Sequence, residues 1–187
     1  MTRIPGHTIT DAPAASRPML ESVVQFSPTG KPLNLHAQMA HSPAVLAAYT
    51  GIRQATAAHG TLPPQVRSAL MLATAGVTRS AYTEAVTARL ALQAGWSPAQ
   101  VSSLRDGQSV GDQKADSLVR VVREAAARAG QVSDPTWQQA TASGWTSEEL
   151  AEAFAYLGLT IFTAYFLTYA QTPLDLPVDV PAASQQG

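Results

Sequence analysis

Three hydroxyl side chains are spaced so that they share one face of a predicted helix. In the stretch RSAYTEAVT (79–87), Ser80, Thr83 and Thr87 stand at positions i, i+3 and i+7. This spacing places them on one side of a helix. Such a stripe is too polar for a dry apolar core, so it is the first candidate for a ligand pocket. The alternative is that these small residues let helices pack closely, with their hydroxyls bonded to the carbonyls at i−4. The chemistry of the stripe depends on the groups that lie beside it.

These hydroxyls cannot act as nucleophiles at neutral pH without a base. A cysteine thiol has a pKa of about 8.5, whereas an aliphatic hydroxyl lies close to water at about 15.7. That difference makes the alkoxide harder to form by roughly 10 kcal/mol. A serine needs a positioned base to overcome this difference, and the helix predicted over 79–94 contains no histidine. The chain also has no cysteine, which excludes disulfides, thiolate metal sites, iron–sulfur clusters and thiol nucleophiles.

Two other side chains of the same helix are candidates to line a pocket beside the stripe. Tyr82 and Glu84 stand on either side of Thr83. Glu84 is the only carboxylate of this helix and becomes a candidate base if it is desolvated. The alternative is an ordinary glutamate on a solvated surface.

The histidines give weaker signals. His36 and His41 lie five residues apart in NLHAQMAH, so on a helix they diverge by about 140°, a poor geometry for a shared metal ion. Either is a candidate to line a pocket, and the alternative for each is an ordinary buried or exposed histidine. His7 and His59 show no sign of a site. We expect neither a metal ion nor a cofactor.

The stretch GQSVG (107–111) satisfies the G-x-S-x-G pattern of hydrolases. A nucleophile elbow needs a strand before the serine and a helix after it. Here a short helix is predicted before the pattern, and no sheet is evident. The glycines and Asp112 instead predict a loop followed by a helix N-cap.

The composition limits the possible partners. Charged residues make up 13% of the chain and the net charge is −1, whereas about 25% is usual. Such a chain has no basic patch, so we expect no nucleic acid partner. The weakly charged surface favours a homo-oligomer. The first residues, MTRIPGHTITDAPAASRP, lack the apolar core of a signal peptide, and a cytoplasmic location is expected.

The elements that must position these residues are helices. Ser-Pro or Asp-Pro pairs at 42–43, 97–98 and 134–135 each offer a capping oxygen and a proline at the first helical position. The stretch TSEE (146–149) has the spacing of a capping box. No alternating β-branched run predicts a strand. Helices are predicted over 34–41, 43–59, 64–77, 79–94, 98–105, 113–129, 135–143 and 147–170.

One predicted segment has the composition of a membrane span. Residues 153–169, AFAYLGLTIFTAYFLTY, carry no charge, and their length approaches that of a spanning helix. Three acidic residues precede the segment, and no lysine or arginine flanks it. We therefore predict a buried core helix and no membrane partner.

Two segments resemble each other. AGWSPAQVSSL (94–104) and SGWTSEELAEA (143–153) both read as a small residue, glycine, tryptophan and a hydroxyl residue before a helix. Each predicts a helix that ends at a glycine, a tryptophan that packs over the turn and a new N-cap. We interpret the pair as one duplicated helix-turn-helix unit. The alternative is that the same turn sequence arose twice independently.

This unit, together with the hydroxyl stripe one helix before it, resembles the AhpD-like/carboxymuconolactone decarboxylase family of all-helical proteins. The resemblance runs from NLHAQMAHSPAVLAAYTGI (34–52) through residues 62–108 to FTAYFLTYAQTPLDLP (162–177). It covers about three-quarters of the chain and implies an all-α, AhpD-like fold that forms homo-oligomers.

The resemblance also places a lost redox site on the hydroxyl stripe. The peroxidase branch of the family carries Cys-x-x-Cys-x-x-x-His on this helix and a glutamate one helix upstream. The cysteines fall on Ser80 and Thr83, the histidine on Thr87 and the glutamate on Ser68. All four positions differ from the family pattern, so we expect no thiol peroxidase activity.

Two functions follow as hypotheses. The first is a non-redox protein that binds a small ligand or acts as a structural oligomer. The alternative is a repurposed enzyme that performs acid–base chemistry on a small organic acid or lactone with Tyr82, Glu84, His36 or His41. The predicted organisation is a flexible segment over 1–17, the helical domain over 18–171 and a proline-rich tail over 172–187.

Overall fold

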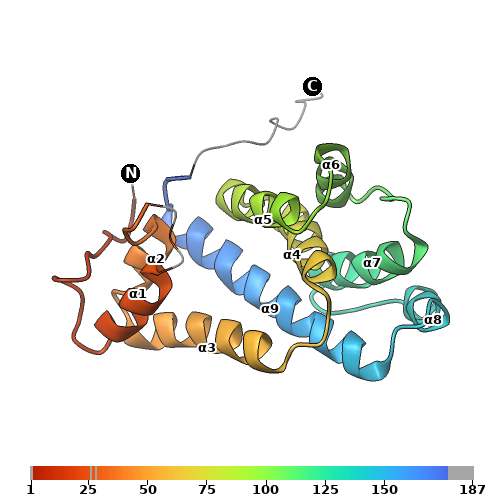
Figure 1. The fold of residues 1–187 in the computed structure, drawn as a ribbon, viewed down its shortest axis with the longest axis horizontal. Helices are drawn as coiled ribbons and strands as arrows, with labels where there is room; N and C mark the ends of the chain where they lie inside the picture. Colours follow the sequence, from red (N-terminus) through yellow and green to blue (C-terminus); the bar gives the residue numbers. More distant parts are fainter. Residues whose placement is uncertain (1, 26, 28, 177–187) are drawn as a thin grey trace.

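The structure, a computed structural model, describes residues 2–25, 27 and 29–176, and within these residues it contains nine helices and no strand (Figure 1). The prediction of an all-α fold is confirmed within these residues. The helices are α1 (Arg17–Val24), α2 (Asn34–Met39), α3 (Pro43–His59), α4 (Pro64–Thr78), α5 (Ala81–Gln93), α6 (Pro98–Asp106), α7 (Gln113–Ala127), α8 (Asp134–Ala142) and α9 (Ser147–Ala170).

The eight predicted helices all exist, with two informative differences at their ends. The motif helix begins at Ala81 rather than at residue 79, because Arg79 adopts a left-handed conformation (φ 54°) that ends α4. Ser80 is therefore the N-cap of α5, and its side chain accepts a hydrogen bond from the backbone N–H of Thr83. In α8 the N-cap is Ser133, one residue before the predicted Asp134. The structure adds α1, which was not predicted.

The duplicated unit is visible in a pair of tryptophan hydrogen bonds. Trp96 donates its indole N–H to the carbonyl of Gln65 at 2.9 Å, and Trp145 donates to the carbonyl of Lys114 at 2.9 Å. Each carbonyl lies 31 residues before its tryptophan, so the two bonds join the first helix of a unit to the turn before its third helix. The units are α4–α6 and α7–α9.

A buried serine accompanies each of these bonds. Ser68 donates its hydroxyl to the carbonyl of Gln65 at 2.8 Å, and Ser117 donates to that of Lys114 at 2.7 Å. Both turns also contain a glycine with positive φ, Gly95 (98°) and Gly144 (88°), which a residue with a Cβ would strain. Both third helices begin with a complete capping box. The repetition therefore extends to individual hydrogen bonds.

Helix α9 runs through the centre of the fold and packs against α3, α4, α5 and α7 (Figure 1). By length and composition alone it is apolar enough to cross a membrane. Its buried residues, however, join both apolar cores of the protein: Leu157 lies in the core of the duplicated units, and Leu167 in the core formed with α1–α3. These contacts are those of a central core helix.

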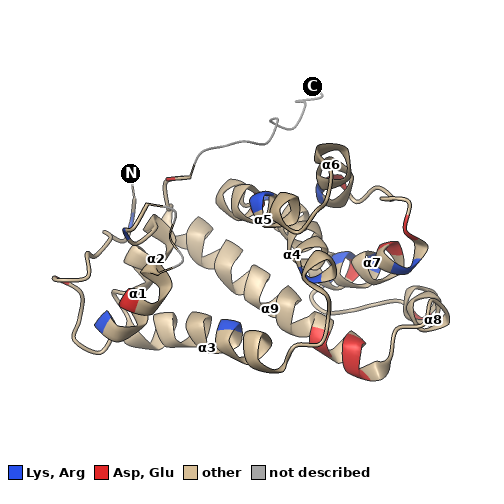
Figure 2. Ribbon diagram, viewed as in Figure 1, with Lys and Arg blue, Asp and Glu red and all other residues tan. Residues whose placement is uncertain are grey.

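Charged residues gather on α7 and at the start of α9, and the remainder of α9 carries none (Figure 2). Among the described residues, the ion pair observed for α7 joins Glu124 to Arg128, which follows the helix, at 2.5 Å. Asp116 instead accepts a hydrogen bond from the backbone N–H of Val110 at 2.9 Å. It thus ties the α6–α7 loop to α7.

Both ends of the described chain lie against α2. The backbone N–H of Arg3 bonds to the carbonyl of Ala170, and that of His7 bonds to the carbonyl of Ala37, each at 2.9 Å. Ala12 and Ser16 are buried. These contacts fall within the segment predicted to be flexible, and the predicted domain boundaries stay predictions. Of the predicted tail, residues 177–187 lie outside the described residues.

The repeated indole bonds predict matched losses of stability. We expect Trp96→Phe and Trp145→Phe each to lower the free energy of unfolding by about 1–3 kcal/mol, because each loses a hydrogen bond and leaves space in the core. Urea denaturation measures both. Trp137→Phe is the control, because Trp137 is 43% exposed, and it is expected to change stability by less than about 0.5 kcal/mol. A loss in only one of the two variants would show that the bonds are not equivalent.

Candidate functional site: a basic cavity beside the motif helix

A cavity of about 540 Å³ lies between the N-terminal helices and the motif helix. Its walls come from α1 to α5 and α9, and Leu176 of the C-terminal segment completes them. Its volume is within the range typical of small-ligand sites, roughly 300–1,000 Å³. The apolar part of the lining is Val23, Leu33, Leu35, Met71, Val86, Leu90, Leu159 and Leu176.

The cavity brings together only half of the residues predicted for a site. Thr83, Thr87, Tyr82 and His36 line it. The other four predicted residues, Ser68, Ser80, Glu84 and His41, do not line it. The acid–base hypothesis expected Tyr82, Glu84 and the histidines to converge on a closed cavity. Only Tyr82 and His36 of this set reach it.

The hydroxyl stripe is occupied by its own hydrogen bonds. Thr83 donates its hydroxyl to Oγ of Ser80 at 2.9 Å, and Thr87 donates to the carbonyl of Thr83 at 2.8 Å. All three side chains are buried. A hydroxyl that donates to a neighbouring carbonyl has its proton committed, and no base contacts it here. The stripe therefore contributes small side chains with paired hydroxyls to the cavity wall, and it contributes no nucleophile.

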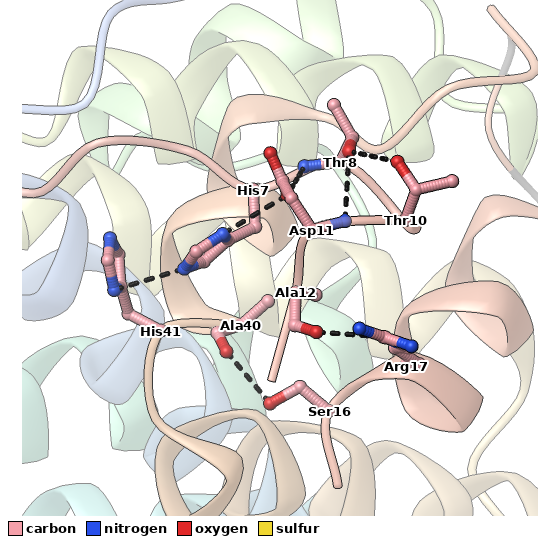
Figure 3. Close-up of polar contacts among 9 residues, drawn as sticks. All are labelled: His7, Thr8, Thr10, Asp11, Ala12, Ser16, Arg17, Ala40 and His41. Atoms are coloured by element: carbon pink, nitrogen blue, oxygen red, sulfur yellow. Dashed lines mark hydrogen bonds and ion pairs between the residues drawn. The ribbon is translucent and has the colours of Figure 1, made fainter. Parts of the chain in front are cut away.

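Glu84 and His41 lie elsewhere. Burial raises the pKa of Glu84, and the charged groups that act on this carboxyl are Arg105 and Asp106 of α6. Glu84 thus faces α6, on the other side of α5 from the cavity. His41 is exposed after the end of α2 and contacts His7 (Figure 3).

His36 is the unusual residue of the cavity. It is 6% exposed, and its Nδ1 is the only buried side-chain nitrogen or oxygen without a hydrogen-bond partner among the described residues. Its Nε2 lies 3.3 Å from the hydroxyl of Tyr49, and Arg53 donates to that same hydroxyl at 3.1 Å. An orphaned buried nitrogen costs about 1–3 kcal/mol, so a ligand that pairs with it recovers that free energy.

The protons of this chain of bonds can be assigned from its chemistry. The guanidinium of Arg53 is always a donor, so the oxygen of Tyr49 accepts from it. A phenol polarised in this way is a strong donor, and we assign its proton to the bond with Nε2 of His36. The imidazole then carries its own proton on Nδ1, which makes the orphaned atom a donor. Burial, aided by the charge of Arg53, lowers the pKa of His36 to about 4, so the ring is neutral at pH 7.

The charged residues of the cavity are all cations. Arg53, Arg67 and Arg89 line it, and none of the described lining residues is an aspartate or glutamate. Arg67 and Arg89 are half-buried, where water screens their charge less than on an open surface. An arginine presents up to five N–H donors in a planar fork that matches a carboxylate. The cavity is therefore electrostatically suited to an anion.

The C-terminal segment reaches the cavity through Leu176, and the preceding residue, Asp175, anchors it outside the lining. Its carboxylate accepts a bond from the hydroxyl of Tyr82 at 2.6 Å and another from the backbone N–H of Asn34 at 2.7 Å. The second bond satisfies an N–H group in the first turn of α2, which has no side-chain cap of its own. Burial and Asp175 raise the pKa of Tyr82, so this phenol stays protonated. No local sequence signal marks Asp175 for this role, because its partners lie 93 and 141 residues away along the chain.

The G-x-S-x-G stretch is a loop, as predicted. Gly107 ends α6 in a left-handed conformation (φ 77°), and the hydroxyl of Ser109 donates to Asp116 at 2.5 Å. The segment before it is a helix, whereas a nucleophile elbow requires a strand. Ser109 therefore holds the loop to α7.

The depressed pKa of His36 predicts a loss of stability in mild acid. The unfolded chain binds this proton near pH 6.5 and the folded chain near pH 4, so the unfolded state takes up more protons between these values. The free energy of unfolding should fall as pH decreases through this window, by on the order of 3 kcal/mol. We expect His36→Asn to flatten this part of the profile in urea denaturation at pH 4–7. An unchanged slope in that variant would contradict the assignment.

Comparison with known proteins now places the fold. The model of the carboxymuconolactone decarboxylase family matches residues 43–124, which span α3 to most of α7 and include the motif helix. No curated protein sequence matches the chain.

Several solved structures share the fold at low sequence identity. A peroxidase-related protein from Ralstonia eutropha JMP134 with an AhpD core has a TM-score of 0.81 at 14% identity, over 93% of this chain and 92% of that one. A peroxidase-related protein from Silicibacter sp. TM1040 has a TM-score of 0.73 at 12% identity, over 95% and 97%.

The debrominase Bmp8 in complex with 2,3,4-tribromopyrrole has a TM-score of 0.75 at 12% identity, over 94% of this chain and 92% of that one. At such identities a structural likeness shows the fold alone, and the family match adds a sequence signal over the motif region. The chain therefore has the predicted AhpD-like fold, and its residues 43–124 match the carboxymuconolactone decarboxylase family model.

Proposed function

We propose that this protein is a non-thiol member of its family that binds a small, partly apolar organic anion in the cavity beside α5. The observation that carries the proposal is the neutral, buried His36, whose Nδ1 has no partner within the described structure, in a cavity whose charged lining residues are arginines. The chain has no cysteine, so a dithiol cycle has no residues to run on.

The ligand would meet two kinds of surface. Leu35, Met71 and Val86 offer apolar contact, and the arginines with Nδ1–H of His36 offer donors for a carboxylate or a similar group. The similar fold of Bmp8 accommodates a tribrominated pyrrole, and this size of ring suits a volume of about 540 Å³. A five- or six-membered aromatic ring with one anionic substituent is the ligand class that we propose.

Binding is favoured over acid–base catalysis for a chemical reason. With a pKa of about 4, His36 is a poor proton acceptor at neutral pH, because an effective base has a pKa near the working pH. The proton of Tyr82 is held by Asp175. The two candidate acid–base residues that line the cavity, His36 and Tyr82, therefore do not favour the alternative of a repurposed enzyme. The cytoplasmic location stays a prediction.

Pyrrole-2-carboxylate and its neutral isostere pyrrole-2-carboxamide test the proposal by isothermal titration calorimetry. We expect the carboxylate to bind at least about tenfold more tightly, because charge-assisted bonds to arginine are roughly twice as strong as neutral ones. Arg67→Met should remove most of this preference. Arg120→Met is the matched control, because Arg120 is exposed on α7 outside this cavity. Equal affinity for the acid and the amide would rule out an anion site.

We also propose that two copies associate through one face of α9. Phe154, Tyr165 and Tyr169 are 65%, 62% and 68% exposed, and their spacing of 11 and 4 residues places them on one side of the helix. This face carries no charge (Figure 2). Gly158 lies on the same side with open space at its Cβ position, so a second helix can approach closely. The charge-free aromatic face matches a second copy of itself, as a twofold interface requires.

The oligomeric state is measured by analytical ultracentrifugation. We expect Phe154→Glu combined with Tyr165→Glu to convert the oligomer to a monomer, because four like charges would meet across a twofold axis. Trp137→Glu, at an exposed tryptophan on α8, is the control and should leave the mass unchanged. A wild-type protein that stays monomeric at 100 µM, or a double variant that still associates, would refute this interface.

A further inference from the structure

A second polar cluster lies outside the cavity, where the N-terminal segment meets the turn between α2 and α3 (Figure 3). Nε2 of His7 lies 3.2 Å from Nδ1 of His41, and Nδ1 of His7 lies 3.2 Å from a carboxylate oxygen of Asp11. The two histidines are 34 residues apart in sequence. Neither takes part in the proposed ligand site.

The backbone on both sides of the cluster is held in place. The N–H of His7 bonds to the carbonyl of Ala37 at 2.9 Å, and the buried hydroxyl of Ser16 bonds to the carbonyl of Ala40 at 2.8 Å (Figure 3). Gly6 lets the segment lie close to α2, because a Cβ at this position would come within 3.1 Å of the Cβ of Ala37. The two imidazoles are therefore brought together by the fold.

The aspartate defines the protonation of His7. A carboxylate accepts hydrogen bonds and cannot donate them when ionised, so Nδ1 of His7 carries the proton and Nε2 presents a lone pair. Asp11 is itself fixed, because its carboxylate also accepts from the backbone N–H of Thr8 at 2.7 Å. A histidine oriented by a carboxylate through its other nitrogen is the usual arrangement of a metal ligand.

We propose that Nε2 of His7 and Nδ1 of His41 bind one divalent cation of the zinc class, with Asp11 as the residue that positions His7. Two nitrogens at about 2.0–2.1 Å from a tetrahedral zinc ion lie about 3.3 Å apart, close to the 3.2 Å between these two atoms. The ring centroids lie 4.1 Å apart and the ring planes are tilted by 58°, so coordination requires the exposed His41 ring to rotate until both lone pairs point at the ion.

Binding of the cation leaves the number of protons on the two neutral imidazoles, His7 and His41, unchanged. His41 donates its Nδ1 proton to His7 when the metal is absent, and it takes the tautomer protonated on Nε2 when Nδ1 coordinates. No group of three His, Cys, Asp or Glu side chains among the described residues is placed to hold a metal. The remaining coordination positions therefore belong to water, and the site is an open one. An ion there would pin the N-terminal segment to α2, the helix that carries His36 into the cavity.

Calorimetric titration of the full-length protein with Zn²⁺ at pH 7.5 tests the site, with Mg²⁺ as a cation that prefers oxygen ligands. We expect one saturable zinc site per chain and no magnesium binding. His7→Gln and His41→Gln should each weaken zinc binding at least about tenfold. Asp11→Asn should weaken it about 10- to 100-fold, the usual effect of removing an orienting partner. His59→Gln, at an exposed histidine that ends α3, is the control and should leave the affinity unchanged.

A second readout separates loss of the ligands from loss of the fold. Zinc should raise the Tm of the wild type, and it should not raise the Tm of His41→Gln, although that variant keeps the helical circular dichroism of the wild type. Zinc binding that survives in both histidine variants, or that falls equally in His59→Gln, would overturn the proposal. A wild type that binds no zinc would overturn it too and leave the cluster as a hydrogen-bonded clamp.

Discussion

A polar group taken out of water needs a hydrogen-bond partner. This requirement explains why the hydroxyl stripe of the cavity wall is unreactive and why His36 is available to a ligand. In a helical core the nearest partners are carbonyls of the same helix. Thr87 uses such a carbonyl, and Thr83 donates to the capping Ser80, so the hydroxyl stripe is chemically closed. His36 has one nitrogen for which the described fold supplies no partner. The same constraint therefore makes one face of the cavity inert and leaves another face ready for a ligand.

The scaffold keeps its integrity without the family's redox residues because different residues hold it together. The indole bonds of Trp96 and Trp145 and the carbonyls that receive them lie at the ends of helices, away from the cavity wall. Ser68 shows the difference most clearly. The resemblance places it at a motif position, yet its hydroxyl bonds to Gln65 as that of Ser117 bonds to Lys114. In this chain the position belongs to the repeated framework.

The cavity is a composite of distant segments, and its charge follows from that assembly. Arg53 comes from α3, Arg67 from α4 and Arg89 from α5, so none of them marks a basic cluster in a chain with net charge −1. Asp175 belongs to the C-terminal segment. Its carboxylate accepts hydrogen bonds from the hydroxyl of Tyr82 and from the backbone N–H of Asn34 in the first turn of α2. The gathering of three arginines around one cavity thus arises from packing in a chain that is almost neutral overall.

The sequence by itself determined eight of the nine helices in the described part of the chain, the repeated unit, the resemblance to the family and the absence of cysteine chemistry. Each of these depends on local signals, such as the capping box at Thr146, or on composition, and local signals act through neighbouring backbone groups. Only the tertiary structure decided which side chains share a space. Glu84 and Tyr82 lie two residues apart but face α6 and the cavity respectively, because a helix turns about 100° per residue. His36 is buried in the cavity wall, whereas His41 lies after the end of α2 and contacts His7. That contact joins residues 34 positions apart, so no local sequence signal reveals it.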